Sequence, residues 1–246
     1  MKKIFTWILL TLPAIVIIVI AAFFIWANDA YPADDAALQA LTSDSQVTVT
    51  ADEYITFQPA NLQPTTGFIF YPGGRVDYRA YAPVLRMIAE GGYFVALVPV
   101  PFNMAFFDVN AATPVLEEHP EIQTWVVGGH SLGGAMASVF AKDHLAELDG
   151  VIFFASYPAD ESLKNADIKV LSIYGTNDMA GMGTFDEKKS LLAADTEYVV
   201  IEGGNHAQFG SYGFQAGDNA ATISAAEQWS QTAAATLEFL RELEQQ

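Results

Sequence analysis

The sequence has no cysteine and is poor in histidine and basic residues. Without cysteine, the chain can form no disulfide, thiolate metal site or lipid-modified cysteine. The four histidines are not spaced as metal ligands, so we expect no metal and no cofactor; they are His119, His130, His144 and His206. Only 11 basic residues stand against 29 acidic ones, which gives a net charge of −18. Nucleic acid is therefore not expected as a partner.

Charge is also absent from residues 4–28, which directly follow Lys2 and Lys3. An uncharged apolar stretch of this length is long enough to cross a bilayer as a helix. We predict an uncleaved signal-anchor over residues 1–28 that crosses the cell membrane once, with the lysines inside and the remaining chain extracytoplasmic. A cleaved signal peptide is the alternative, but its apolar core is normally about 7–15 residues long and ends at a small-residue cleavage site.

Residues 29–45 are rich in alanine, aspartate and serine, and they are predicted to form a tether or a weak helix. Residues 46–246 then read as one large domain. Its first two segments, residues 46–50 and 54–58, alternate apolar and polar side chains. This pattern favours an antiparallel strand pair, which we place at the edge of a sheet.

Beyond this pair, apolar strand-like segments alternate with helical patterns. The predicted strands are residues 67–71, 93–98, 125–128, 151–155, 169–174 and 198–202, and the predicted helices are residues 78–89, 111–118, 132–148, 185–193 and 222–243. Such alternation predicts an α/β fold, in which a doubly wound, mostly parallel sheet is flanked by helices. Ligands of such sheets bind beyond the carboxyl ends of the strands.

One predicted strand runs through Gly129-His130-Ser131-Leu132-Gly133 directly into a helix. This Gly-x-Ser-x-Gly pattern is typical of a nucleophile elbow, where a strained turn lifts the serine hydroxyl above the sheet. The two outer glycines let the strand and the helix approach closely. We therefore predict Ser131 as a nucleophile, the alternative being an ordinary serine in a strand-to-helix turn.

A serine nucleophile needs a base, and the base needs a carboxylate to orient it. Asp178 and His206 each follow a predicted strand, and the order serine, aspartate, histidine is the one used with this elbow. We predict that these residues complete a catalytic triad. Asp160 and Glu161, which follow an earlier strand, remain rival acids.

Two backbone N–H groups are needed to stabilise the oxyanion that forms during attack. The amide of Leu132, at a helix N-terminus, is one candidate, and Gly74 is the preferred second donor, with Gly73 and Arg75 as alternatives. Aromatic side chains near these segments are candidates for lining a substrate pocket. They are Phe102, Phe106, Phe107, Phe209 and Tyr212.

Four motifs of this chain resemble those of the α/β-hydrolase superfamily: the elbow, Gly175-Thr176-Asn177-Asp178, Gly204-Asn205-His206 and Pro72-Gly73-Gly74. Within it, residues 46–244 are similar to the small, lidless hydrolases of the dienelactone-hydrolase and chlorophyllase-like groups (α/β-hydrolase fold-5). The resemblance implies a serine hydrolase with no cofactor. A serine in place of the cysteine of dienelactone hydrolase argues against that specific reaction.

These observations predict a membrane-anchored, extracytoplasmic serine hydrolase of the carboxylesterase class. It would cleave small-molecule esters through an acyl-enzyme and contact the bilayer through residues 4–28. Two alternatives stay open: a catalytically silent protein of the same fold that binds a ligand or partner at the cell surface, and an amidase or peptidase. The physiological substrate and the oligomeric state are left open.

Overall fold

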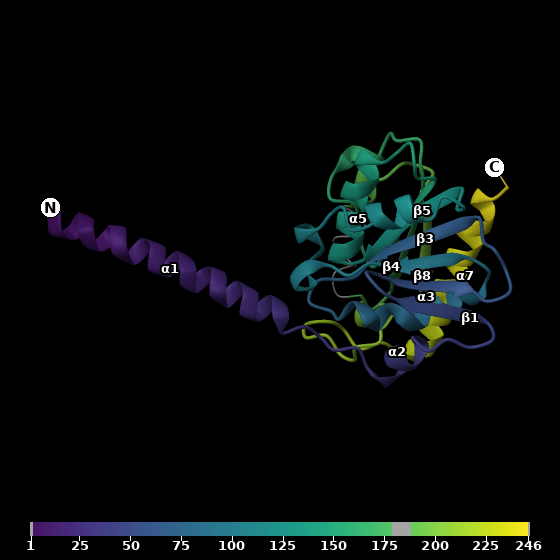
Figure 1. The fold of residues 1–246 in the computed structure, drawn as a ribbon, viewed down its shortest axis with the longest axis horizontal. Helices are drawn as coiled ribbons and strands as arrows, with labels where there is room; N and C mark the ends of the chain where they lie inside the picture. The colour runs from purple at the N-terminus through teal and green to yellow at the C-terminus, as the bar shows by residue number, and fades with distance from the viewer. Residues whose placement is uncertain (1, 179–187, 246) are drawn as a thin grey trace.

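A computed structural model describes residues 2–178 and 188–245, with only the backbone described for residues 2–11. Its centre is an eight-stranded sheet with helices on both faces (Figure 1). The strands are β1 (Val47–Ala51), β2 (Ile55–Pro59), β3 (Thr66–Tyr71), β4 (Phe94–Leu97), β5 (Thr124–His130), β6 (Gly150–Phe154), β7 (Lys169–Gly175) and β8 (Glu197–Ile201).

The described α-helices are α1 (Lys2–Asn28), α2 (Asp35–Ala40), α3 (Ala82–Glu90), α4 (Thr113–Glu118), α5 (Leu132–Asp143) and α7 (Ala225–Leu243). The described 3-10 turns are η1 (Tyr78–Tyr81), η2 (Pro101–Asn103), η3 (Ala105–Phe107), η4 (Glu161–Leu163), η5 (Lys189–Leu191) and η6 (Ala207–Phe209). Both sets alternate with the strands along the chain, as the sequence predicts.

The order of strands across the sheet is β1-β2-β4-β3-β5-β6-β7-β8. The first two strands form the predicted antiparallel pair at the edge, and β2 is also antiparallel to β4. From β4 to β8 all neighbours are parallel. The predicted doubly wound, mostly parallel sheet is therefore confirmed, and its central strands have their carboxyl ends at one edge.

Alternating side chains along the strands separate the core into two layers. In β3, Phe68 and Phe70 pack on the face that α3 and α7 cover, whereas Ile69 and Tyr71 pack on the opposite face with α5. Successive strand residues point to opposite faces, so a strand buried on both sides must be apolar throughout. This is why the central strands read as continuous apolar runs in the sequence.

Several helix bounds differ from the sequence predictions. The helix predicted over residues 132–148 already ends at Asp143. The helix predicted over residues 185–193 begins outside the described residues, and its described part contains η5. The closing helix begins at Ala225 and not at residue 222, because Ser224 is its N-cap. Ser224 and Glu227 form the predicted reciprocal capping box, which satisfies free N–H groups of the first turn.

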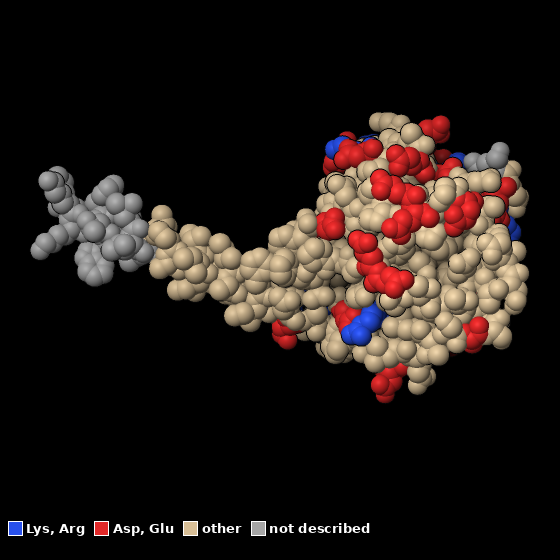
Figure 2. All heavy atoms as spheres, in the orientation of Figure 1, with Lys and Arg blue, Asp and Glu red and all other residues tan. Residues whose placement is uncertain are grey.

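Helix α1 projects away from the domain (Figure 1), and its described part shows no charged side chain, whereas acidic side chains are spread over the visible face of the domain (Figure 2). Searched over the described part of the chain, no helix combines the length and the apolarity that crossing a membrane requires. The predicted transmembrane helix is therefore not confirmed. Part of it, residues 1–11, lies outside the residues whose side chains are described.

Residues 29–45, predicted as a tether or weak helix, contact the domain. The Asp34 carboxylate caps α2 and accepts a hydrogen bond from Ser211 Oγ at 2.5 Å. The Tyr31 N–H donates to the Arg75 carbonyl at 2.7 Å. These bonds fix the end of α1 beside the loop that follows β3.

A cluster of like charges lies where β8 meets α7. Burial raises the pKa of Glu197, and the charges of Glu242 and Glu238 raise it further, while Lys169 lowers it. A carboxyl whose pKa is raised by folding favours the folded state only while it is protonated. Its contribution to the free energy of unfolding is therefore lost as the pH rises through the raised pKa.

We expect Glu197→Gln to stabilise the protein at pH 7, because glutamine has no charge to place in this cluster. The gain should vanish below pH 4.5, the ordinary pKa, where the wild-type carboxyl is also neutral. Urea unfolding at both pH values measures this. Glu147→Gln, at an exposed site, removes the same net charge and serves as the control. An equal gain from both variants would show that only the net charge matters.

Candidate active site

Ser131 lies at the carboxyl end of β5, at the corner where α5 begins. Its backbone has φ 52° and ψ −122°, a conformation that non-glycine residues rarely adopt. The Ser131 N–H donates to the Phe154 carbonyl at 3.0 Å, and its own carbonyl accepts from Ser156 Oγ at 2.6 Å. Bonds to the end of β6 and to the residue pair that follows it thus hold the strained turn in place.

The elbow needs its glycines because neighbouring segments of backbone pass very close to it. A Cβ on Gly129 or on Gly133 would overlap the carbonyl oxygen of Tyr71. A Cβ on Gly134 would collide with the Ser156 side chain. The end of β3 and the start of α5 can therefore meet only because these positions lack side chains.

Asp178 and His206 are brought together by two loops at the same edge of the sheet. The loop after β7 contacts the loop after β8: the Asn177 N–H donates to the Gly204 carbonyl at 2.8 Å. A Cβ on Gly175 would overlap Gly204, so this approach also depends on glycine. From α7, the buried Gln228 accepts from the Asn205 N–H at 3.0 Å and positions the residue before His206.

The His206 Nδ1 atom lies 3.2 and 3.1 Å from the two carboxylate oxygens of Asp178. Asp178 is only 1% exposed and His206 only 6%, so solvent screens this pair weakly. The rival acid Asp160 lies elsewhere: it caps η4 and contacts Lys142, with half of its side chain exposed. Among the described contacts, the Ser131 hydroxyl makes no hydrogen bond to His206.

His130, the residue before the serine, lies beneath His206. The two imidazole centroids are 4.4 Å apart, and the Phe209 ring stacks on His130 with centroids 5.8 Å apart. Burial lowers the pKa of His130 well below its ordinary value, and the nearby His206 lowers it further. A neutral His130 therefore supports His206 without adding a second positive charge.

Tyr81 links His130 to the loop after β3. Its hydroxyl lies 2.8 Å from His130 Nδ1 and accepts a hydrogen bond from the Gly73 N–H at 3.0 Å. Burial raises the Tyr81 pKa far above its ordinary value, so the hydroxyl keeps its proton. No local pattern in the sequence points to Tyr81, because it lies about fifty residues before the histidine and in no motif.

Backbone hydrogen bonds distinguish the three candidates for the second oxyanion donor. The Gly73 N–H is used by Tyr81, and the Arg75 N–H donates to the Asn103 carbonyl at 2.8 Å. The Gly74 N–H has no hydrogen-bond partner among the described residues. Gly74 also lies beside Leu132, since a Cβ on it would be 3.0 Å from the leucine side chain. Leu132 is the first residue of α5, where N–H groups have no partner within the helix.

The predicted pocket residues divide into two groups. Phe209 and Tyr212 are buried and contact His130 and Tyr81. Phe102, Phe106 and Phe107 lie at the surface, each more than 40% exposed.

A cleft of about 460 Å³ opens over Gly74 and Leu132. Phe106 forms part of its lining, together with side chains from the end of α1. The cleft therefore places apolar surface beside the two backbone N–H groups described above. A volume of this size is typical of sites for small organic ligands.

Comparisons with solved structures agree with this architecture. The chain is similar to a dienelactone hydrolase from Anabaena variabilis (TM-score 0.61, 15% identity, 80% of this chain and 98% of that one). It is also similar to esterase B from Lactobacillus rhamnosis (TM-score 0.60, 14% identity, 85% and 91%). A thermostable esterase from Pseudomonas putida has a TM-score of 0.59 at 14% identity, over 82% of this chain and 86% of that one. Identities this low establish the fold and not the reaction.

No curated protein sequence matches the chain. The sequence model of the alpha/beta hydrolase family matches residues 67–230 and therefore includes the elbow, both loops and the start of α7. Together with the parallel sheet, this match confirms the resemblance that the motifs indicate: the chain belongs to the α/β-hydrolase family.

Proposed function

We propose that this protein is a serine hydrolase that cleaves carboxylic esters, with Ser131 as nucleophile, His206 as base and Asp178 as the orienting carboxylate. The observation that carries the proposal is a serine on a strained elbow at the same sheet edge as a buried histidine–aspartate pair. A binding protein has no need of this combination. The apolar cleft beside the elbow favours a substrate with an apolar acyl or alcohol group.

In the first half of the reaction, Ser131 Oγ attacks the ester carbonyl carbon and its proton moves to His206 Nε2. Asp178, which contacts Nδ1, holds the imidazole in the tautomer that leaves Nε2 free as acceptor. The tetrahedral intermediate collapses when the carbon–oxygen bond of the alcohol breaks, and His206 Nε2 returns the proton to the departing oxygen. An acyl ester of Ser131 remains.

In the second half, His206 Nε2 takes a proton from water while the water oxygen attacks the acyl carbon. The bond to Ser131 Oγ then breaks, the serine regains its proton, and the carboxylic acid is released. In both halves the negative charge develops on the former carbonyl oxygen. The N–H groups of Leu132 and Gly74 are the donors that we assign to it.

The test is to label the full-length protein with a fluorophosphonate and then to supply aryl esters and matching anilides. Labelling of Ser131 and turnover of the esters would support the proposal. Absence of labelling would favour a silent ligand-binding protein, and preferred cleavage of the anilides would favour an amidase. Mass spectrometry of the labelled peptide locates the modified residue.

We also propose that residues 4–28 hold the protein in the cell membrane as an uncleaved anchor, with the domain outside the cytoplasm. Lys2 and Lys3 precede the segment and acidic residues follow it. The apolar side chains of residues 15–20 are about half to two-thirds exposed and need a partner. Retention is favoured because Arg75 Nε donates to the Trp26 carbonyl, a contact that cleavage after Ala27 would remove.

We expect the full-length protein to sediment with membranes and to resist extraction by high salt, because an apolar helix is held by burial and not by charge. Immunoblotting of the salt wash measures this. Protease added to intact cells should digest the domain. A mature protein in the medium that begins near residue 28–31 would instead identify a cleaved signal peptide.

A further inference from the structure

The end of α1 forms one side of the cleft over Gly74 and Leu132. The lining comes from three parts of the chain: the end of α1 and the residues after it, the loop after β3 with η3 and the elbow, and the loop after η6. The lining residues are Phe23, Trp26, Tyr31, Gly74, Arg75, Met104, Phe106, Leu132, Gln215 and Ala216. Most of these side chains are apolar or aromatic.

Arg75 fixes the last turn of α1 against the domain. Its Nε donates to the Trp26 carbonyl at 2.8 Å, and its Nη2 donates to the Asp29 carbonyl at 2.6 Å. The guanidinium carbon also lies 4.5 Å from the centroid of the Trp26 ring. Arg75 therefore ties the end of α1 and the residue after it to the loop that follows β3.

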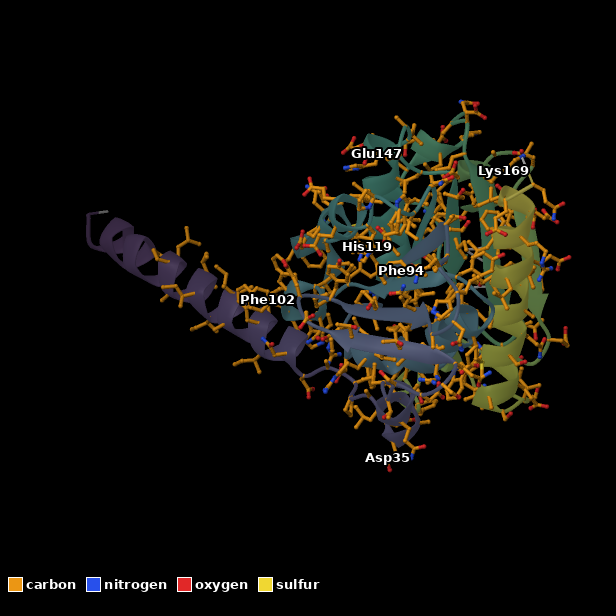
Figure 3. The ribbon with its side chains drawn as sticks, turned by 45° about the vertical axis from the view of Figure 1, so that its right-hand side comes forward. Asp35, Phe94, Phe102, His119, Glu147 and Lys169 are labelled. Atoms are coloured by element: carbon orange, nitrogen blue, oxygen red, sulfur yellow. The ribbon has the colours of Figure 1, made fainter. Side chains whose placement is uncertain are left out.

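Aromatic side chains complete this junction. Phe24 lies 4.6 Å from Phe102 between ring centroids and 6.1 Å from Phe107, and Ala27 is fully buried. In Figure 3, Phe102 lies where α1 meets the domain. The helix end is thus packed on η2 and η3, the turns beside the cleft, so Phe23 and Trp26 have defined positions along its wall.

From this arrangement we infer that α1 is part of the substrate site, and that it selects esters carrying a medium-length apolar chain. The inference rests on the proposed function. The apolar walls favour a chain of methylene groups, each worth about a fourfold gain in binding when buried. The net charge of −18 in addition disfavours an anionic substrate.

The experiment uses the full-length chain in lipid nanodiscs and measures kcat/KM for the p-nitrophenyl esters of acetate and octanoate. We expect the wild type to prefer octanoate. Trp26→Ala and Phe23→Ala should each lower the octanoate-to-acetate ratio about tenfold, the size of effect that a lost apolar contact gives. Trp26→Phe should restore most of the ratio. Ile18→Ala, at an exposed position of α1, is the matched control and should keep both kinetic constants.

If Trp26→Ala and Phe23→Ala leave the octanoate-to-acetate ratio of kcat/KM unchanged, the inference is overturned. This holds whether kcat/KM for the two esters stays the same or falls equally for both. A second measurement does not depend on catalysis. In a Ser131→Ala background, calorimetry compares the binding of 2-decanone and 2-butanone, with empty nanodiscs as the blank. If the protein prefers the longer ketone and Trp26→Ala abolishes this preference, the result supports α1 as a wall of the substrate site, even if no ester is hydrolysed. If the wild type hydrolyses neither ester but still prefers the longer ketone, only the proposed function is overturned.

Discussion

Replacing Ser131 with alanine is expected to abolish fluorophosphonate labelling and to lower kcat for aryl esters by at least about 10⁴-fold. The hydroxyl forms the bond to the acyl group, so no other group of the site can substitute for it. Its removal should leave the melting temperature nearly unchanged, because the elbow is held by backbone bonds of Ser131 and not by its hydroxyl.

Ser230→Ala, at an exposed serine of α7, is the control for the loss of a hydroxyl. It should retain parental labelling and turnover. Labelling is followed by gel fluorescence and turnover by release of p-nitrophenol. If Ser131→Ala hydrolyses esters at the parental rate, the assignment of the nucleophile is wrong.

Replacing Asp178 with asparagine is expected to lower kcat by about 10³- to 10⁴-fold. Asparagine keeps the size of the side chain, but its amide can donate a hydrogen bond to His206 Nδ1 and so favour the tautomer that cannot accept the serine proton. Because the acid is 1% exposed, water cannot take over its role.

Asp160→Asn is the matched control, because this aspartate also follows a strand of the sheet but caps η4 at the surface. We expect it to keep nearly full activity, measured as kcat and KM for the same aryl ester. Strong loss in Asp160→Asn together with a mild effect of Asp178→Asn would identify the acid after β6 and not the one after β7.

Local sequence patterns predicted the sheet and the elbow, because both depend on neighbouring residues. Apolar runs identify strands buried on two faces, and β3 shows the two-sided packing that requires them. Gly129 and Gly133 identify the elbow, because only residues without a side chain fit beside the Tyr71 carbonyl. The capping box at Ser224 likewise predicted where α7 begins.

Other features could not be read from local patterns. The sequence favours Asp178 but leaves Asp160, which also follows a strand, as a rival acid. The contact between the loops after β7 and β8 places Asp178 against His206. Phe209 reads like Phe106 in the sequence, yet one is core and the other lines the cleft. Whether such a side chain is buried depends on which residues from distant parts of the chain pack against it.

The sequence by itself thus determined the α/β fold, the strained serine turn and the candidate histidine, since periodicity and glycine spacing act over a few residues. Tertiary structure decided which acid meets His206, which backbone N–H after β3 is left without a partner, and that the end of α1 lies beside the cleft. These features depend on segments that meet only after the chain folds: Arg75 holds the Trp26 carbonyl across 49 residues of sequence.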